Sequence, residues 1–388
     1  MIKQKIFSFL KNKRCTLLGV GPMSVNCVDT VIELSNELDI PIFLIASRRQ
    51  IDSEDFGGGY VNSWSTNNFS NYVFERDKKG KVILARDHGG PWQNPKEIEQ
   101  SLSLKKAMES AKESYLADIK AGFDILHLDP SIDIHRTPTV DDILDRLLEL
   151  YEYCWSQANK LNKDITFEIG TEEQSGSTHS QEELDYVLQS VKDFCRINNI
   201  PTPTFVVIQA GTKVLETRNV GSFDSPIRIK DEIPAEIQIP RMLEICKKNN
   251  ILMKAHNADY LSDIALSWHP RLGIPAINVA PEFGVTESIG LIEILEKNNL
   301  VNEAEEFLKL SYESMKWEKW LAPNSNTNDR QKSIISGHYI FSDPIFLELK
   351  NKCKVALLEK GISLDEFLKS KIKESIMRYV KNLRLVSK

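Results

Sequence analysis

Short runs of apolar residues alternate along the chain with longer segments in which apolar residues recur every three or four positions. The short runs are rich in β-branched residues and predict buried strands, whereas the longer segments predict amphipathic helices. The eight predicted strands are residues 16–20, 41–47, 81–85, 123–128, 165–169, 204–208, 251–255 and 276–280. Strands that alternate with helices in this way predict a parallel sheet.

Eight strands are the number that closes a (β/α)₈ barrel, whereas an open doubly wound sheet usually has fewer. An open sheet also concentrates its ligand groups at one switch point, but here polar strand ends are spread along residues 1–298. The pattern therefore predicts an α/β fold, a (β/α)₈ TIM barrel over residues 1–298. Residues 299–388 predict a helical extension packed on the barrel, which could equally serve as an oligomer interface.

Several individual helices can be predicted within this frame. Residues 95–121 and 302–320 each predict one continuous helix, and residues 1–15 predict a basic amphipathic helix rather than a signal sequence, because the apolar stretch is too short. Ser363 followed by Glu366 predicts a capping box at the start of the last helix.

Composition excludes some classes of partner. The net charge of −6 is mild and no long basic block occurs, so neither nucleic acid nor an anionic membrane is expected. No run approaches the roughly 18 apolar residues of a membrane span. The six cysteines are scattered without a C-x-x-C pair, as expected of core thiols in a reducing cytoplasm. We expect a cytoplasmic homo-oligomer that binds a small molecule.

Residues capable of chemistry follow five of the predicted strands. The runs KVILARDHGG, FDILHLDPS, ITFEIGTEE, TFVVIQAGT and ILMKAHNAD each end in a carboxylate, imidazole or amide. The C-terminal strand ends of a TIM barrel form its active face, so these groups should meet there. The predicted site residues are Arg48, Gln50, Asp87, His88, Asp129, Glu172, Gln209, His256, Asn278 and Glu282. A mixed set of histidine and carboxylate side chains is typical of a divalent transition metal.

Some positions admit two interpretations. Glu168 competes with Glu172 for a ligand role, and Glu172 is preferred because it lies beyond Gly170, nearer the expected rim. Asp129 ends its strand and is expected in the site, whereas His127 is expected to be structural. The local sequence of His256 fits a packed core histidine as well as a ligand.

Two loops also have a functional and an ordinary interpretation. Gly57-Gly58-Gly59 could cradle a phosphate through its backbone N–H groups, or could simply be a turn. Residues 212–233 form a long loop of mixed charge, which could be a lid over the site or a surface excursion.

The order of the motifs FGGGYVNSWSTNNFSNYVFE, RDHGGP, AGFDILHLD, EIGTEE, VIQAG and KAHNADY resembles the tagatose-bisphosphate aldolase Z-type subunit family, which is related to the zinc-dependent class II aldolases. The resemblance runs from about Leu18 to beyond Glu282, and SGHYIFSDP continues it more weakly. It implies a (β/α)₈ barrel in which Asp87 is the acid/base and His88 and His256 hold zinc. Glu172 lies where the family has an acidic residue.

Two departures from the class II aldolase pattern stand out. Gln209 occupies the place of another zinc-binding histidine, and Asn257-Ala258-Asp259 replaces the Gly-Gly-Ser phosphate clamp. The first departure weighs against a three-histidine zinc site, and the second weighs against a bisphosphate substrate.

Taken together, these features predict a metal-dependent aldolase or C4 epimerase acting on a ketose or ketose phosphate. His88, His256 and Glu172 would hold a divalent metal, with zinc expected first and Mn²⁺, Co²⁺ or Mg²⁺ as alternatives. Asp87 and Glu172 would be catalytic. The substrate would contact Arg48, Gln50, Asp129, Gln209, Asn278 and Glu282. The alternative is a non-catalytic subunit that stabilises a partner aldolase.

Overall fold

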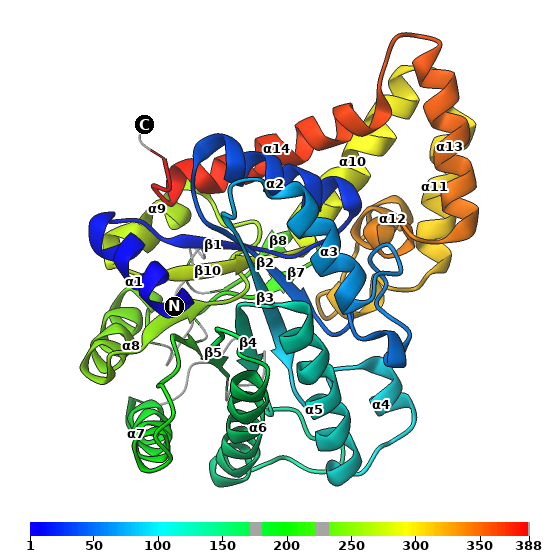
Figure 1. Ribbon diagram of the computed structural model, residues 1–388. Helices are drawn as coiled ribbons and strands as arrows, with labels where there is room; N and C mark the ends of the chain where they lie inside the picture. Colours follow the sequence, from blue (N-terminus) through cyan, green and yellow to red (C-terminus); the bar gives the residue numbers. More distant parts are fainter. Residues whose placement is uncertain (171–180, 209, 222, 224–232, 387–388) are drawn as a thin grey trace.

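The computed structural model describes residues 1–170, 181–208, 210–221, 223 and 233–386. Within these residues, eight parallel strands form a closed barrel in the order β1-β10-β9-β6-β5-β4-β3-β2 (Figure 1). They are β1 (Leu17–Val20), β2 (Ile42–Ser47), β3 (Val82–Gly89), β4 (Ile125–Leu128), β5 (Thr166–Ile169), β6 (Phe205–Ile208), β9 (Leu252–Ala255) and β10 (Ala276–Val279). These strands coincide with the eight predicted ones, so the predicted (β/α)₈ fold is confirmed.

Helices surround the barrel (Figure 1); the first seven named below connect successive strands, and α10 follows the last strand. They are α2 (Val25–Leu38), α3 (Thr66–Arg76), α5 (Leu104–Ala121), α6 (Val140–Lys160), α7 (Gln181–Ile197), α8 (Ala235–Asn249), α9 (Asp263–Leu272) and α10 (Pro281–Lys297). Strands β1, β4, β5, β6 and β10 are buried at every position. This is the consequence of packing side chains on both faces of a parallel sheet.

The interior of the barrel changes from apolar to polar along the strands. The rings of Phe43 and Phe205 meet edge to face with their centroids 6.0 Å apart. The ammonium group of Lys254 lies 5.7 Å from the Phe43 centroid and 5.8 Å from the Phe205 centroid. Further toward the C-terminal strand ends, strand pairing places His127 of β4 level with Glu168 of β5. An aromatic layer therefore forms the floor beneath a layer of ionisable groups.

Three predicted helical features are wrong in detail. Residues 95–121 form two helices, α4 (Pro95–Glu99) and α5, because Ser101 adopts a left-handed backbone with φ 48°. Residues 302–320 form α11 (Val301–Glu313) and the short η2 (Glu318–Trp320), with Met315 left-handed between them. The last helix begins after Ser363, but this side chain makes no capping hydrogen bond.

The C-terminal region builds a second apolar core. It comprises α11, α12 (Asp329–Ser336), η3 (Gly337–Ile340), α13 (Pro344–Leu358) and the start of α14 (Leu364–Asn382), packed on the distal half of α10. The rest of α14 returns to the barrel and lies against α2 and α9 (Figure 1). Ile372, Ile376 and Tyr379 of this helix belong to the barrel core.

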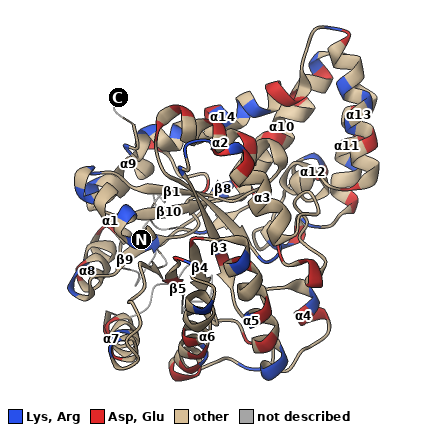
Figure 2. Cartoon of the chain, viewed as in Figure 1, with Lys and Arg blue, Asp and Glu red and all other residues tan. Residues whose placement is uncertain are grey.

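Figure 2 shows basic and acidic residues on the same outer helices, such as α5, α6 and α13. Across the described ranges, no helix is both long enough and apolar enough to span a membrane. The N-terminal α1 (Ile2–Asn12) is amphipathic as predicted, with Ile2 and Ile6 buried.

Candidate active site

A cavity of about 810 Å³ opens at the C-terminal ends of the barrel strands. Seven predicted site residues line it: Arg48, Gln50, Asp87, His88, Asp129, His256 and Asn278. Its volume falls in the range of small-molecule sites. Three other residues were also predicted in the site. Glu172 and Gln209 lie outside the described residues. Glu282 is described but does not line the cavity.

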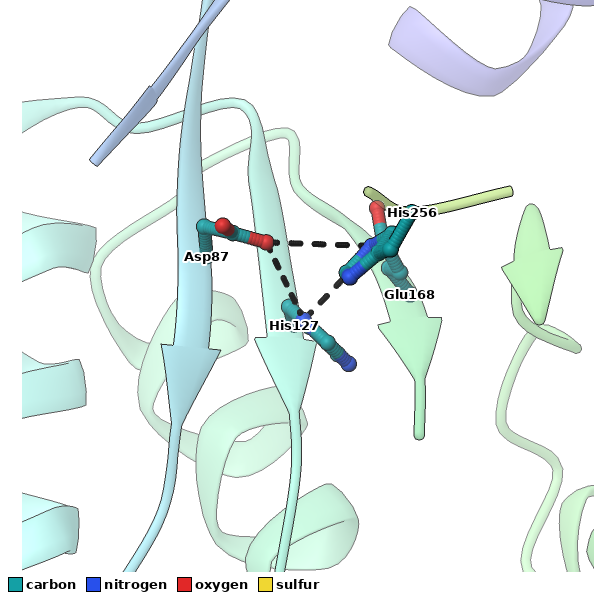
Figure 3. Close-up of side chains that lie close together, drawn as sticks. All are labelled: Asp87, His127, Glu168 and His256. Atoms are coloured by element: carbon teal, nitrogen blue, oxygen red, sulfur yellow. Dashed lines mark hydrogen bonds and ion pairs between the residues drawn. The ribbon is translucent and has the colours of Figure 1, made fainter. Parts of the chain in front are cut away.

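Four side chains converge at the base of this cavity: Asp87, His127, Glu168 and His256 (Figure 3). One ligand atom from each lies within 4.8 Å of the others. His256 Nε2 is 3.3 Å from Glu168 Oε1 and 3.9 Å from Asp87 Oδ1, and His127 Nδ1 is 3.5 Å from Asp87 Oδ1. Two ligands of one tetrahedral zinc ion lie about 3.4 Å apart, because each bond is about 2.1 Å long. The cluster therefore has the size of a metal site.

The charges of this region favour a cation. Lys254 donates to Glu168 Oε2 at 2.6 Å, and both side chains are buried. Although burial opposes it, Lys254 lowers the pKa of Glu168 to about 2, with His127 adding to the effect. Three carboxylates, Asp87, Asp129 and Glu168, face one lysine, which leaves two negative charges if the histidines are neutral. Buried charge of this kind requires protonated histidines or a bound cation.

His88 is oriented by a carboxylate. The pairing of β3 with β4 shifts between Arg86 and Gly89, and His88 there adopts a left-handed backbone with φ 44°. Its Nδ1 lies 2.7 Å from Asp129 Oδ2, so Nδ1 carries the proton that Asp129 accepts. Burial lowers the pKa of His88, but Asp87 and Asp129 together have the larger effect and raise it to about 9. A histidine fixed in this way by a carboxylate is typical of metal ligands, which bind through the other nitrogen.

His127 is held by a backbone hydrogen bond, whereas His88 is held by a carboxylate. Its Nδ1 accepts the backbone N–H of His88 at 3.1 Å. Its Nε2 is buried with no hydrogen-bond partner within the described residues, and it faces Gly170. A Cβ atom at Gly170 would lie 2.5 Å from this nitrogen. The prediction that His127 is structural agrees with its contact to the His88 backbone, yet its ring also belongs to the four-residue cluster.

Asn278 connects two members of the cluster. Its Nδ2 lies 3.0 Å from His256 Nε2 and 3.1 Å from Asp87 Oδ1. Its Oδ1 is buried and has no partner among the described residues. Neighbouring Gly19 leaves room for this side chain, because a Cβ there would lie 2.4 Å from Asn278 Oδ1. Asn278 therefore lies where it can orient both Asp87 and His256.

Arg48 and Gln50 line the cavity but bind neighbouring protein groups. The Arg48 guanidinium donates to Asp52 at 2.9 Å and to Glu97 at 2.6 Å, in addition to the Gly90 carbonyl. The Gln50 amide oxygen accepts from the backbone N–H and hydroxyl of Ser47. The buried Arg48 side chain thus stabilises the loops beside the site.

Glu282 is not brought into the cavity. Its carboxylate accepts the Tyr260 backbone N–H at 2.5 Å and the hydroxyl of Tyr379, and it lies 3.5 Å from Arg378. Both Tyr379 and Arg378 belong to α14. In this structure the side chain joins the barrel to the C-terminal helix.

Of the two interpretations of Gly57–Gly59, the structure favours an ordinary turn over a phosphate cradle. The three N–H groups donate to the carbonyls of Glu54, Ser53 and Trp64, respectively, so none of them is directed at a ligand. The glycines still line the cavity as a turn. Of the predicted lid, the hairpin of β7 (Val214–Leu215) and β8 (Arg218–Asn219) packs on the loop after β9, whereas residues 222 and 224–232 lie outside the described residues.

Comparison with known proteins identifies the fold. No protein-family model matches the sequence, and no curated protein matches it. A solved structure described as a probable tagatose 6 phosphate kinase from Sinorhizobium meliloti 1021 is similar, with a TM-score of 0.68 and 15% identity over 95% of this chain and 100% of that chain. A fructuronate-tagaturonate epimerase from Cohnella laeviribosi has a TM-score of 0.61 and 10% identity, covering 95% of this chain and 81% of its own.

A fructose-bisphosphate aldolase from Campylobacter jejuni is also similar, with a TM-score of 0.56 and 12% identity over 99% of this chain and 94% of that chain. At these identities the similarity concerns the fold. The chain therefore has a TIM barrel of the kind found in aldolases and in a sugar epimerase. Membership in the Z-type subunit family stays a prediction.

Proposed function

We propose that this protein is a metal-dependent enzyme that acts on a ketose or a ketose derivative, as an aldolase or a C4 epimerase. The observation that supports this most directly is the cluster that Glu168 forms with Asp87 and His256, two residues that line the cavity together with His88. The occurrence of the same barrel in aldolases and a sugar epimerase is consistent with the proposal.

His88, Glu168 and His256 would hold the metal. We propose Glu168 as the carboxylate ligand, because its Oε1 lies 3.3 Å from His256 Nε2 while Lys254 binds its other oxygen. Glu172, the ligand expected from the sequence, lies outside the described residues. His88 is preferred over His127, since His127 Nδ1 already accepts a backbone N–H. Imidazole and carboxylate ligands suit zinc and related divalent ions. When bound, such an ion polarises a substrate carbonyl and stabilises an enediolate.

Asp87 would carry the proton. Its side chain is 13% exposed and can be reached from the cavity. Although burial raises it, the charge of His88 holds the pKa of Asp87 well below its ordinary value, so the carboxylate is ionised. Asn278 donates to Asp87 Oδ1 and thereby orients it.

The proposed reaction begins when Asp87 removes the proton of the C4 hydroxyl. The C3–C4 bond then breaks, its electrons pass to the enediolate, and C4 becomes an aldehyde. Asp87 then transfers the proton to C3 of the enediolate, and release of the two fragments completes an aldol cleavage. If the aldehyde instead turns and the bond reforms on its other face, Asp87 returns the proton and the product is the C4 epimer.

The test is turnover of a panel of ketoses, ketose phosphates and keto-uronates, followed by proton NMR. We expect the wild-type protein to convert at least one of them. Asp87→Asn should reduce kcat by at least about 100-fold, the usual contribution of a general acid/base. Lys309→Met, on the far helix α11, serves as a control that should keep full activity. If no compound is converted, the non-catalytic aldolase subunit becomes the better account.

A further inference from the structure

One wall of the cavity carries basic and aromatic side chains that the proposed reaction does not use. Part of its wall comes from the C-terminal extension through Lys316, Lys319, Trp320 and Tyr339. Arg49, in the loop after β2, lines the same cavity. The extension therefore contributes directly to the cavity that holds Asp87 and His256.

Arg49, Lys316 and Lys319 form a cluster of positive charge at this wall. Within the described residues, none of the three has a carboxylate at ion-pair distance. Arg48, the neighbour of Arg49 in sequence, differs because it pairs with Asp52 and Glu97. The three basic residues of the cluster are exposed, but partial loss of water around the Lys319 ammonium group lowers its pKa to about 8, and repulsion from Arg49 and Lys316 adds to this effect. Three cations that face one cavity without an acidic partner indicate a place for an anion.

Aromatic side chains fix the position of Lys319. Its ammonium group lies 4.9 Å from the ring centroid of Trp320 and 4.9 Å from that of Tyr339. The Trp320 indole donates to the Tyr339 hydroxyl at 3.2 Å, and the Tyr339 ring packs on Tyr60 at 4.9 Å. Ser342 ties the extension to the same loop by donating to the Tyr60 carbonyl at 2.8 Å. Trp320 and Tyr339 therefore hold the Lys319 ammonium group at the part of the extension that contacts the Tyr60 loop.

Arg49 and Lys319 line the same cavity as His88 and His256. A molecule that fills the cavity can therefore contact both ends. A cavity of about 810 Å³ is large enough for a six-carbon sugar with one anionic group.

We propose that Arg49 and Lys319 bind an anionic group at the end of the sugar remote from its reacting carbonyl. The substrate class is thus a ketose with one anionic terminus, either a phosphate or a carboxylate. Arginine binds both groups through paired hydrogen bonds, and lysine adds a point charge. This inference rests on the proposed function.

Elsewhere among the described lining residues, a second phosphate would meet fewer free donors: Lys96 also lines the cavity, but its ammonium group donates to the Phe56 carbonyl. The N–H groups of Gly57–Gly59 donate to backbone carbonyls. The loop after β9 presents Asp259, whose neighbour Glu282 adds further negative charge. Both features disfavour a bisphosphate, so the anionic terminus is a single one.

The experiment compares D-tagatose, D-tagatose 6-phosphate and D-tagaturonate, which share a carbon skeleton and differ at C6. The wild-type kcat/KM should be higher for an anionic ketose than for tagatose, and the better of the two anions identifies the terminus. Lys319→Met and Arg49→Met should each raise KM for that anion by about tenfold to hundredfold with little change in kcat, because charge-assisted hydrogen bonds are lost. The KM for tagatose should change much less, because tagatose carries no anionic group. Equal losses for neutral and anionic sugars would overturn the proposal.

Lys309→Met is the matched control, because Lys309 lies on α11, pairs with Glu313 and does not line the cavity. It should behave as wild type with all three sugars. Binding of inorganic phosphate, measured by calorimetry with the His256→Ala variant, tests the anion site without turnover or the metal. We expect binding that Lys319→Met and Arg49→Met abolish. If no ketose reacts but phosphate binds in this way, the proposed function fails and the anion site stands. If phosphate does not bind, the anion site is refuted.

Discussion

The buried ion pair between Lys254 and Glu168 allows a quantitative prediction. Lys254 is 1% exposed and Glu168 is fully buried, and their charged groups are 2.6 Å apart. The pKa of Glu168 falls from an ordinary 4.5 to about 2, which corresponds to about 3 kcal/mol at about 1.4 kcal/mol per pH unit. Lys254→Met keeps the length of the side chain and removes its charge. We expect it to reduce the free energy of unfolding by about 3–5 kcal/mol, the usual cost of leaving one buried charge unpaired.

The pH dependence of stability follows from the same pair. Because the folded-state pKa of Glu168 is depressed, its contribution is fully present above about pH 4.5 and is lost as the pH falls toward 2. Without Lys254 the folded-state pKa should rise toward or above the unfolded value. The Lys254→Met protein should therefore lose less stability than wild type between pH 4.5 and 2.

The assay is urea denaturation of the wild type, Lys254→Met, Glu168→Gln and the double variant. In the Glu168→Gln background there is no buried carboxylate to leave unpaired, so Lys254→Met should cost clearly less than in the wild type. A cost below about 1 kcal/mol in the wild type, or the same cost in both backgrounds, would refute the reasoning.

Two further predictions concern other parts of the molecule. Gly170→Ala should place a Cβ 2.5 Å from His127 Nε2, so that the ring must shift. We expect urea denaturation to show a free energy of unfolding about 1–3 kcal/mol lower than in the wild type, together with lower activity. Unchanged stability and activity would contradict this description of the His127 pocket. Burial lowers the pKa of His269 to about 4 and that of His338 to about 3. Both rings are neutral when folded and charged when unfolded below pH 6.5, so stability should fall as the pH drops from about 6.5 to 4. His269→Phe should reduce this fall in thermal unfolding, and an unaltered pH profile would count against the buried neutral ring.

Most of the fold could be predicted from the sequence, because apolar runs and helical periodicity alternate regularly through the barrel. Helix interruptions were harder to predict. The break between α4 and α5 depends on the left-handed backbone of Ser101, and nothing in the local residue pattern requires it. The same holds for Met315 after α11.

The candidate site could be predicted only in part. Asp87, His88 and His256 end their strands, and this position on a barrel is informative by itself. His127 and Glu168 lie within four-residue strands that are buried on both faces, so no alternation indicates which side chains point inward. Only the pairing of β4 with β5 shows that they are level with each other.

Contacts between distant segments account for the rest. Glu282 follows a barrel strand and so was predicted to be in the site, yet Tyr379, 97 residues later, binds its carboxylate. Lys319 was not predicted, because its place in the cavity depends on how the extension folds back on the loop that contains Tyr60. Such contacts leave no local pattern in the sequence.

The central claim is that the cavity holds a divalent metal, and the metal content of purified protein tests it most directly. Mass-spectrometric metal analysis should find about one divalent ion per wild-type chain. His88→Ala and His256→Ala should each lose it, and His127→Ala and Lys309→Met should retain it. A wild-type protein that turns over ketoses without bound metal, or a His256→Ala protein that keeps the full complement, would contradict the account.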